Sequence, residues 1–163
     1  MKILISADME GITGVVNVDH VDRNGKDYQW ARKIMTKEVN NAVEGAFAGG
    51  ANEVLVNDSH GSMRNIIPDL LHTDAHLISG SLKELSMMEG LAEDVDGVFF
   101  IGYHAHRQTG RSIMAHTYSG SVLRRVKINE RELGEVGLNA LVAGAFNVPV
   151  LLVTGDDKVC REA

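Results

Sequence analysis

The chain has little cysteine, little proline and no excess of positive charge. Its 163 residues include one cysteine, Cys160, and two prolines, Pro68 and Pro149. A single cysteine cannot form an intrachain disulfide, so nothing in the sequence indicates an oxidising compartment. The formal net charge of -6 argues against nucleic acid as a main partner, because phosphate binding requires a basic surface.

Long apolar runs and several common catalytic motifs are also missing. The first apolar run, residues 3–7, is too short for the hydrophobic region of a signal peptide or for a membrane span. We therefore expect no membrane partner and a cytoplasmic location. The sequence contains no G-x-G-x-x-G, G-x-x-x-x-G-K-[ST], H-E-x-x-H or G-x-S-x-G motif. These absences argue against a dinucleotide fingerprint, a phosphate-binding loop, a single-helix zinc motif and a nucleophile elbow.

The composition suits one compact α/β domain. With 44% apolar and 23% charged residues the chain can bury a core, and its 17 glycines are typical of many tight turns. Apolar runs predict strands, and apolar residues spaced three and four apart predict helices. The expected strands are 2–7, 53–56, 75–78, 97–102 and 148–154, and the expected helices are 28–48, a short one near 83–89, and 135–146. Residues 122–128 alternate imperfectly, which suggests a hairpin through Asn129 and Glu130.

Strands that alternate with helices predict βαβ units. The fold class we expect is α/β, a three-layer sandwich with a largely parallel central sheet, because near-continuous apolar strands are covered on both faces. A single catalytic domain should occupy residues 1–163. The sequence stops inside the helix that should follow the last strand, so we expect this domain to be the amino-terminal part of a longer chain.

Acidic residues and histidines follow four of the predicted strands. In a parallel sheet the carboxyl ends of the strands lie along one edge, where ligand crevices form. A mixture of Asp, Glu and His from dispersed segments is typical of zinc, manganese or cobalt sites. The sequence therefore predicts a metal site at the strand carboxyl ends. The candidates are Asp8 and Glu10, Asp58 and His60, His104 with His106 and His116 nearby, and Asp156 with Asp157.

Each candidate also has a purely structural interpretation. Asp8 and Glu10 suit a solvated turn, and Asp8 suits a helix cap. His60 fits a surface turn, and His104 fits a hydrogen-bonded histidine of the core. Three further histidines are expected to lie outside the site: His72, His76 and His106.

Five sequence blocks resemble the D-aminopeptidase (dipeptide-operon type) family of zinc metallopeptidases. The likeness runs in order over essentially the whole chain and continues through residues 153–157. The opening S-x-D-x-E-G and the N-D-S-H block are together quite specific. The blocks are SADMEGITG at 6–14, VLVNDSH at 54–60, GYHA at 102–105, MAHT at 114–117 and GEVGLNA at 134–140.

This resemblance implies a site with two zinc ions per chain. Asp8 matches the family's bridging carboxylate, and Glu10 and Glu135 match ligands of one zinc. His60 and His104 match ligands of the other. The spacing of the residues does not reveal Glu135, which by itself looks like the acidic first turn of a helix.

The same resemblance implies an aminopeptidase that uses metal-activated water to remove an amino-terminal D-residue, such as D-alanine, from short peptides. His116 matches the histidine with a direct catalytic role, either stabilising the oxyanion or donating a proton to the leaving amine. Family members are considerably longer and form ring-shaped homo-oligomers. Two other functions fit the residues alone: a metal-dependent phosphoesterase, and a non-catalytic ligand-binding domain with a structural metal.

Overall fold

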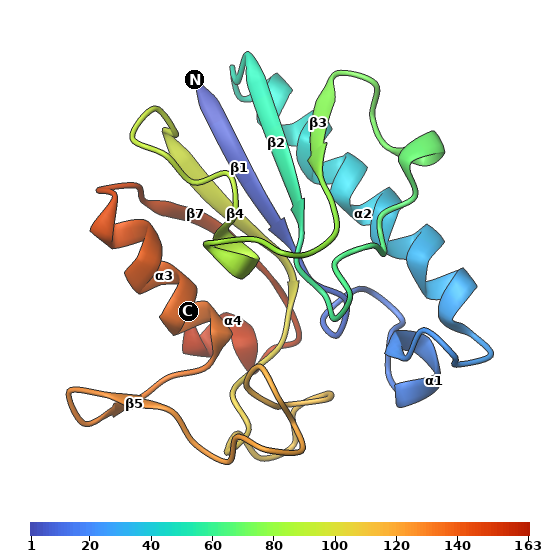
Figure 1. Ribbon diagram of the computed structural model, residues 1–163, viewed down its shortest axis with the longest axis vertical. Helices are drawn as coiled ribbons and strands as arrows, with labels where there is room; N and C mark the ends of the chain where they lie inside the picture. The colour runs from blue at the N-terminus through green and yellow to red at the C-terminus, as the bar shows by residue number, and fades with distance from the viewer.

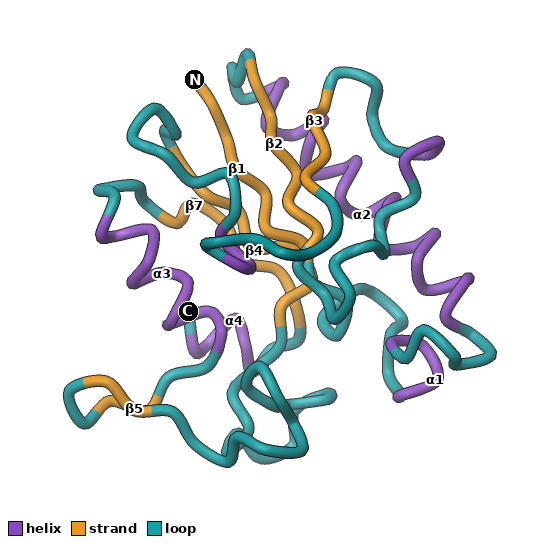
Figure 2. Tube along the Cα trace, in the orientation of Figure 1, coloured by secondary structure: helices purple, strands orange, loops and turns teal.

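The computed structural model describes residues 1–163 and contains a five-stranded sheet in which all strands are parallel (Figure 1). The strand order is β3-β2-β1-β4-β7, so the chain starts in the middle of the sheet and extends it in both directions. Loops gather at the carboxyl ends of the strands (Figure 2). The strands are β1 (Lys2–Ala7), β2 (Glu53–Asp58), β3 (Ala75–Ile78), β4 (Gly97–Tyr103) and β7 (Val150–Gly155).

Helices cover both faces of the sheet, so the predicted three-layer sandwich is confirmed (Figure 1). The long helix α2 (Tyr28–Ala48) packs on one face, where Val39 and Ile5 belong to one buried apolar cluster. Helix α3 (Glu135–Ala145) and the 3-10 turn η2 (Ser86–Met88) pack on the other face. Neighbouring residues of β1 therefore contribute to opposite layers, which explains its unbroken apolar run.

The shorter elements are α1 (Val18–Val21), η1 (Pro68–Leu70), β5 (Lys127–Ile128), β6 (Arg131–Glu132) and α4 (Val159–Glu162). No helix in the structure combines the length and the apolar character that crossing a membrane requires.

Three expected elements differ from the structure in extent. The short helix expected near residues 83–89 is only the 3-10 turn η2, because Ser86 has a positive φ of 52° that interrupts a helix. The hairpin through Asn129 and Glu130 forms, but it is limited to β5 and β6, with both turn residues in the left-handed region. The last strand begins at Val150 rather than 148, since Pro149 has no N–H to donate to the sheet.

The register of the sheet brings the strand ends together. Ala7 at the end of β1 lies beside Asp58 of β2 on one side and beside Ile101 of β4 on the other. Gly155 of β7 lies beside Tyr103 of β4. The residues that follow these strands therefore emerge along one edge, as the sequence predicts.

Glycine allows the loop after β1 to approach the end of β4 closely. The Gly11 N–H donates to the carbonyl of Gly102 at 2.8 Å, and the Asp8 N–H donates to the carbonyl of Ile101 at 2.8 Å. A Cβ atom on Gly11 would overlap the backbone carbonyl of Tyr103. This approach holds the segment that carries Asp8 against β4.

We expect Gly11→Ala to lower the free energy of unfolding by about 1–3 kcal/mol or more, because the added methyl has no room beside Tyr103. Gly45→Ala is the matched control. Gly45 is an exposed residue of α2 with no atom near its would-be Cβ, so alanine there should stabilise the protein by up to about 1 kcal/mol. Urea denaturation of both variants is the measurement, and equal effects would contradict the close-approach argument.

Candidate metal centre

The structure brings together all six residues that the family resemblance assigns to the site. Asp8 and Glu10 follow β1, and His60 follows β2. His104 follows β4, His116 lies in the long loop after β4, and Glu135 is the first residue of α3. Four of the six are almost completely buried, with 1–6% of their surface exposed: Asp8, Glu10, His104 and Glu135. The side chains of His60 and His116 are 11% and 23% exposed and face a cavity of about 180 Å³.

Asp8 lies between two histidines. Its Oδ1 is 3.2 Å from Nδ1 of His60, and its Oδ2 is 3.4 Å from Nε2 of His104. The two oxygens of one carboxylate thus face imidazole nitrogens of residues that follow different strands, β2 on one side and β4 on the other. This is the position that a bridging carboxylate requires.

The two glutamates lie on opposite sides of Asp8. Glu10 Oε2 is 2.8 Å from Nδ1 of His60, and Glu135 Oε1 is 3.3 Å from Nε2 of His104. The tightest groups of ligand atoms are therefore Asp8–Glu10–His60 and His104–His116–Glu135. The resemblance instead pairs Glu10 with Glu135 and His60 with His104, so that division of ligands between two ions stays a prediction.

His116 lies over His104. The two imidazole rings stack with centroids 4.0 Å apart and an interplanar angle of 8°. Nε2 of His116 is 3.9 Å from Glu10 Oε1 and 3.8 Å from Glu135 Oε1. This nitrogen therefore reaches the site from the cavity side, farther from the carboxylates than the other two histidines.

Each of the three histidines has one ring nitrogen on a backbone carbonyl. His60 Nε2 donates to Val21 at 3.0 Å, and His104 Nδ1 donates to Ala105 at 3.1 Å. His116 Nδ1 donates to the carbonyl of Met114 at 3.0 Å. A carbonyl oxygen can only accept, so these bonds fix which nitrogen carries the proton when a ring is neutral. The other nitrogen of each ring faces the carboxylates, which is the arrangement common in histidines that bind metals.

Two buried atoms of the site lack a hydrogen-bond partner, namely Glu10 Oε2 and His104 Nε2. Glu10 Oε2 is near His60 but does not meet hydrogen-bond geometry with it. Buried polar atoms are rarely left unpaired, because each costs about 1–3 kcal/mol. Oxygen and imidazole nitrogen are both zinc ligands. The unpaired atoms and the donor set therefore fit a transition-metal site.

The carboxylates and histidines change one another's protonation. Burial alone would lower the pKa of His60, but Glu10 and Asp8 outweigh it and raise that pKa to about 12. Burial likewise opposes a charge on His104, and Glu135 together with Asp8 raises its pKa to about 10. Burial alone would raise the pKa of Asp8, but the hydrogen bond from His60 and the charge of His104 hold it below its usual range. Without a metal ion, two imidazolium groups thus offset the acidic charge.

The remaining strand-end candidates have structural roles. The Asp58 carboxylate accepts hydrogen bonds from the N–H of Ile66 at 2.7 Å and the side-chain amide of Asn65 at 2.7 Å. Asp156 accepts from backbone groups at the start of α4, and Asp157 pairs with Lys158 at the surface. As expected, three histidines lie away from the site: His72, His76 and His106.

A hydrogen-bonded chain lies beneath the site. The Asn139 amide donates to the hydroxyl of Tyr103 at 3.0 Å, and Tyr103 and Ser6 hydroxyls are 2.7 Å apart. Ser6 in turn donates to the carbonyl of Met87 at 2.6 Å. Asn139 lies one helical turn after Glu135 on α3. The chain therefore ties α3 to β4 and β1, the elements that carry Glu135, His104 and Asp8.

The fold and the cluster define an α/β protein whose sheet edge holds three carboxylates and three histidines, a donor set that suits a transition-metal site. The peptidase M55 family, described as D-aminopeptidase, matches residues 1–163, and the chain belongs to this family.

A sequence match and a structure match show how far the likeness extends. A D-aminopeptidase of Bacillus subtilis (strain 168) is 47% identical over 163 residues, which is all of this chain and 59% of that protein. The solved structure of Zn-dependent D-aminopeptidase DppA from Bacillus subtilis, described as a self-compartmentalizing protease, matches with a TM-score of 0.97 at 47% identity. That match covers 100% of this chain and 59% of the solved one. The chain therefore spans about three fifths of the length of these relatives.

We expect zinc uptake by the metal-free protein at pH 7 to release about two protons per chain. The raised pKa values keep His60 and His104 protonated at this pH, and zinc binds only the neutral ring. Apparent zinc affinity should therefore fall as the pH falls. An indicator dye in weakly buffered solution measures the release, with zinc-saturated protein as the control. Zinc binding without acidification would contradict the protonation described above.

Proposed function

We propose that the protein is a zinc-dependent D-aminopeptidase that removes an amino-terminal D-residue, such as D-alanine, from short peptides. The observation that carries this proposal is the convergence of three carbonyl-anchored histidines on three buried carboxylates, with Asp8 between two of the rings. The names of the relatives agree with it, since both are D-aminopeptidases and one is zinc-dependent.

In this proposal two zinc ions are held per chain by five residues, with Asp8 as the bridge. Imidazole ligands favour zinc over magnesium, which prefers oxygen and keeps several waters. Five protein ligands shared by two ions leave coordination positions open for water and substrate, as catalytic sites require. A structural zinc ion instead has all four of its positions filled by protein ligands. The proposed ligands are Asp8, Glu10, His60, His104 and Glu135.

Bound zinc would supply polarisation of the scissile carbonyl and a water whose pKa falls from about 15.7 toward about 7. The residues of the chain supply orientation and a proton. His116 gives its Nδ1–H to Met114, so Nε2 is the atom that faces the cavity and exchanges a proton there. From this position His116 serves the developing oxyanion or the leaving amine. The carboxylates of Asp8, Glu10 and Glu135 would supply negative charge that balances the positive charge of the two zinc ions.

The whole protein in this proposal forms a ring-shaped homo-oligomer in the cytoplasm. The relative described as a self-compartmentalizing protease supports such an assembly. An enclosed site would restrict substrates to short peptides.

A phosphoesterase fits the site less well. The cavity at the metal centre is lined by 11 residues, and none of them is lysine or arginine. Enzymes that act on phosphoryl groups commonly place such cations, together with metal ions, against the phosphate oxygens. A purely structural metal also fits poorly, because the cluster faces a cavity.

The proposal is tested by measuring zinc content and activity in one preparation of the full-length protein. We expect about two zinc equivalents per chain, with cleavage of D-alanyl p-nitroanilide and little cleavage of L-alanyl p-nitroanilide or phenyl phosphate. A protein that binds no zinc after supplementation would refute the metal site. A zinc-loaded protein that cleaves phenyl phosphate but not the anilides would establish the alternative.

We expect His116→Ala to lower kcat by about 10²–10⁴-fold, the range for a positioned acid–base group, while zinc content and KM change little. The exposed His76 on β3 provides the matched control, and His76→Ala should leave kcat unchanged. Near-normal kcat in His116→Ala would remove the residue from the mechanism. A parallel loss of zinc would make it a metal ligand instead, as its place near His104 and Glu135 also allows.

A further inference from the structure

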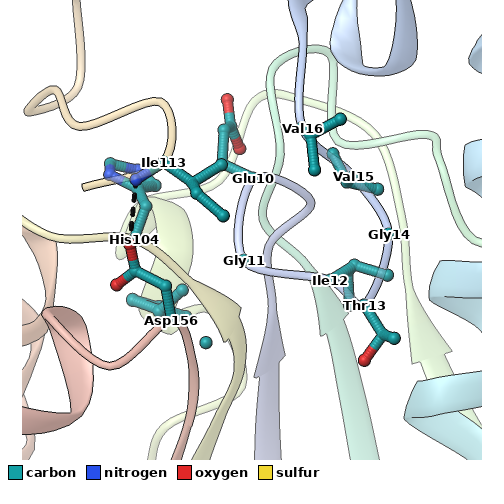
Figure 3. Close-up of a pocket in the computed structure, with 12 residues that line it drawn as sticks. Glu10, Gly11, Ile12, Thr13, Gly14, Val15, Val16, His104, Ile113 and Asp156 are labelled. Carbon is teal, nitrogen blue, oxygen red and sulfur yellow. Dashed lines mark hydrogen bonds between the residues drawn. The ribbon is translucent and has the colours of Figure 1, made fainter. Parts of the chain in front are cut away.

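His60 stands near the start of a short loop, residues 59–65, which follows β2. Its side chain lines the cavity of about 180 Å³. The carboxylate nearest to its ring, that of Glu10, lies in the wall of the same cavity and of a second one of about 160 Å³ (Figure 3). Open space lies beside both side chains, so packing alone does not fix the ring, and its place depends also on the hydrogen bonds of its loop.

The loop contains a backbone conformation that its residues do not all favour. Gly61 has a positive φ of 49°, which glycine adopts readily. Met63 has a positive φ of 56°, which is uncommon for a residue with a side chain and costs free energy. Contacts beyond this turn must therefore hold the loop in its shape.

Asn65 closes the loop with its side-chain amide, and it is 1% exposed. Its Nδ2 donates one hydrogen bond to Oδ1 of Asp58 and another to the backbone carbonyl of His60, both at 2.7 Å. Its Oδ1 accepts a hydrogen bond from the hydroxyl of Tyr28 at 2.6 Å. An amide nitrogen carries two protons, so both are used, and the buried oxygen is paired as well. The Asn65 side chain thus connects the end of β2, the middle of the loop and α2.

The bond to the His60 carbonyl fixes the backbone that carries the ring. The same carbonyl accepts from the Met63 N–H at 2.7 Å, so both of its lone pairs are engaged. The ring donates from Nε2 to the Val21 carbonyl at 3.0 Å and turns Nδ1 toward Asp8 and Glu10. Backbone and ring of His60 are therefore held separately, with Nδ1 facing the two carboxylates.

Helix α2 gives Asn65 a fixed place. Tyr28, the first residue of α2, is 6% exposed and belongs to the buried apolar cluster between this helix and the sheet. Arg32, one turn later, donates from Nε to the backbone carbonyl of Asn65 at 2.7 Å. Asn65 is therefore bound to α2 through both its side chain and its backbone, and it can hold His60 from there.

We propose that Asn65 is a positioning residue for the metal centre, which sets the place of His60 Nδ1 by holding the His60 carbonyl. This inference rests on the zinc site proposed above. Residues that orient metal ligands commonly change metal affinity by about 10–100-fold, because a misplaced ligand must be ordered again when the ion binds. Asn65→Ala keeps the three carboxylates and three histidines of the cluster and removes only the amide that orients one of them. The ion bound beside His60 is the one affected.

The test titrates zinc, in competition with a chromophoric chelator, into the metal-free full-length protein and its variants. We expect Asn65→Ala to weaken the binding of one of the two ions by about 10–100-fold and to leave the other nearly unchanged. Tyr28→Phe, which removes only the hydroxyl that orients the amide, should weaken the same ion by a smaller factor. Asn40→Ala is the matched control, because Asn40 ties the backbone of Leu70 and His72 to α2 through two similar bonds.

A measurement on the metal-free protein separates this inference from the proposed function. Diethyl pyrocarbonate labels imidazole rings, and mass spectrometry gives the labelling rate of His60 relative to that of the exposed His76. We expect this ratio to rise several-fold in Asn65→Ala and to stay constant in Asn40→Ala, because only the first substitution frees the backbone of His60.

The outcomes for the two hypotheses differ. A wild-type protein that binds no zinc, with faster labelling of His60 in Asn65→Ala, would refute the proposed function and not the positioning role. Unchanged zinc affinity and unchanged labelling in Asn65→Ala, or equal effects in Asn40→Ala, would overturn the positioning role and leave the proposed function intact. Should Asn65→Ala fail to fold, the milder Tyr28→Phe decides by the same two measurements.

Discussion

Three carboxylates buried within reach of one another are the feature on which the rest of this structure depends. Asp8, Glu10 and Glu135 are each 3–6% exposed, and like charges in such a place repel strongly unless positive charge lies between them. His60 and His104 supply that charge as imidazolium groups when no metal is bound, and two zinc ions would supply more of it. The fold can thus maintain a highly acidic pocket because the two histidines proposed as metal ligands also neutralise the pocket when no metal is bound.

The scaffold holds these groups through backbone geometry and through a buried chain of side-chain hydrogen bonds. The parallel register places the ends of β1, β2 and β4 side by side, and the glycine approach at Gly11 presses the first ligand segment against β4. Beneath them, the buried chain from Asn139 through Tyr103 to Ser6 connects the helix that carries Glu135 to both central strands. A small displacement of one element would therefore move several of the candidate metal-binding residues.

Much of the fold and part of the site could be predicted from the sequence, for physical reasons that differ from residue to residue. Apolar periodicity located the five main strands and the two long helices, since burial on both faces leaves a continuous pattern. Strand-end position located Asp8, His60 and His104. The spacing of residues in the sequence did not identify Glu135 as a site residue. A glutamate at the start of a helix is common, and only the tertiary packing turns this one toward β4.

The same strand-end argument overreached at Asp58 and Asp156, whose carboxylates accept backbone N–H groups instead of facing the cluster. Loops of irregular conformation, such as the one that presents His116, carry no periodic signal, so their contacts follow only from the structure or from family likeness. The zinc number and the role of His116 remain predictions of that likeness, which the geometry of the cluster supports.

The carbonyl anchors of the histidines have a consequence for how the site exchanges its ions. The rings of His60 and His104 can keep one N–H bond to the backbone whether the other nitrogen holds a proton or, as proposed, a metal ion, so loading the proposed site would require no ring flip and no new tautomer. Exchange of a proton for zinc would then be confined to the inward-facing nitrogens. In the proposed metal site, loss and recovery of an ion would therefore involve only the exchange of a proton and a metal ion at the inward-facing nitrogens, with the rings held in place by the backbone.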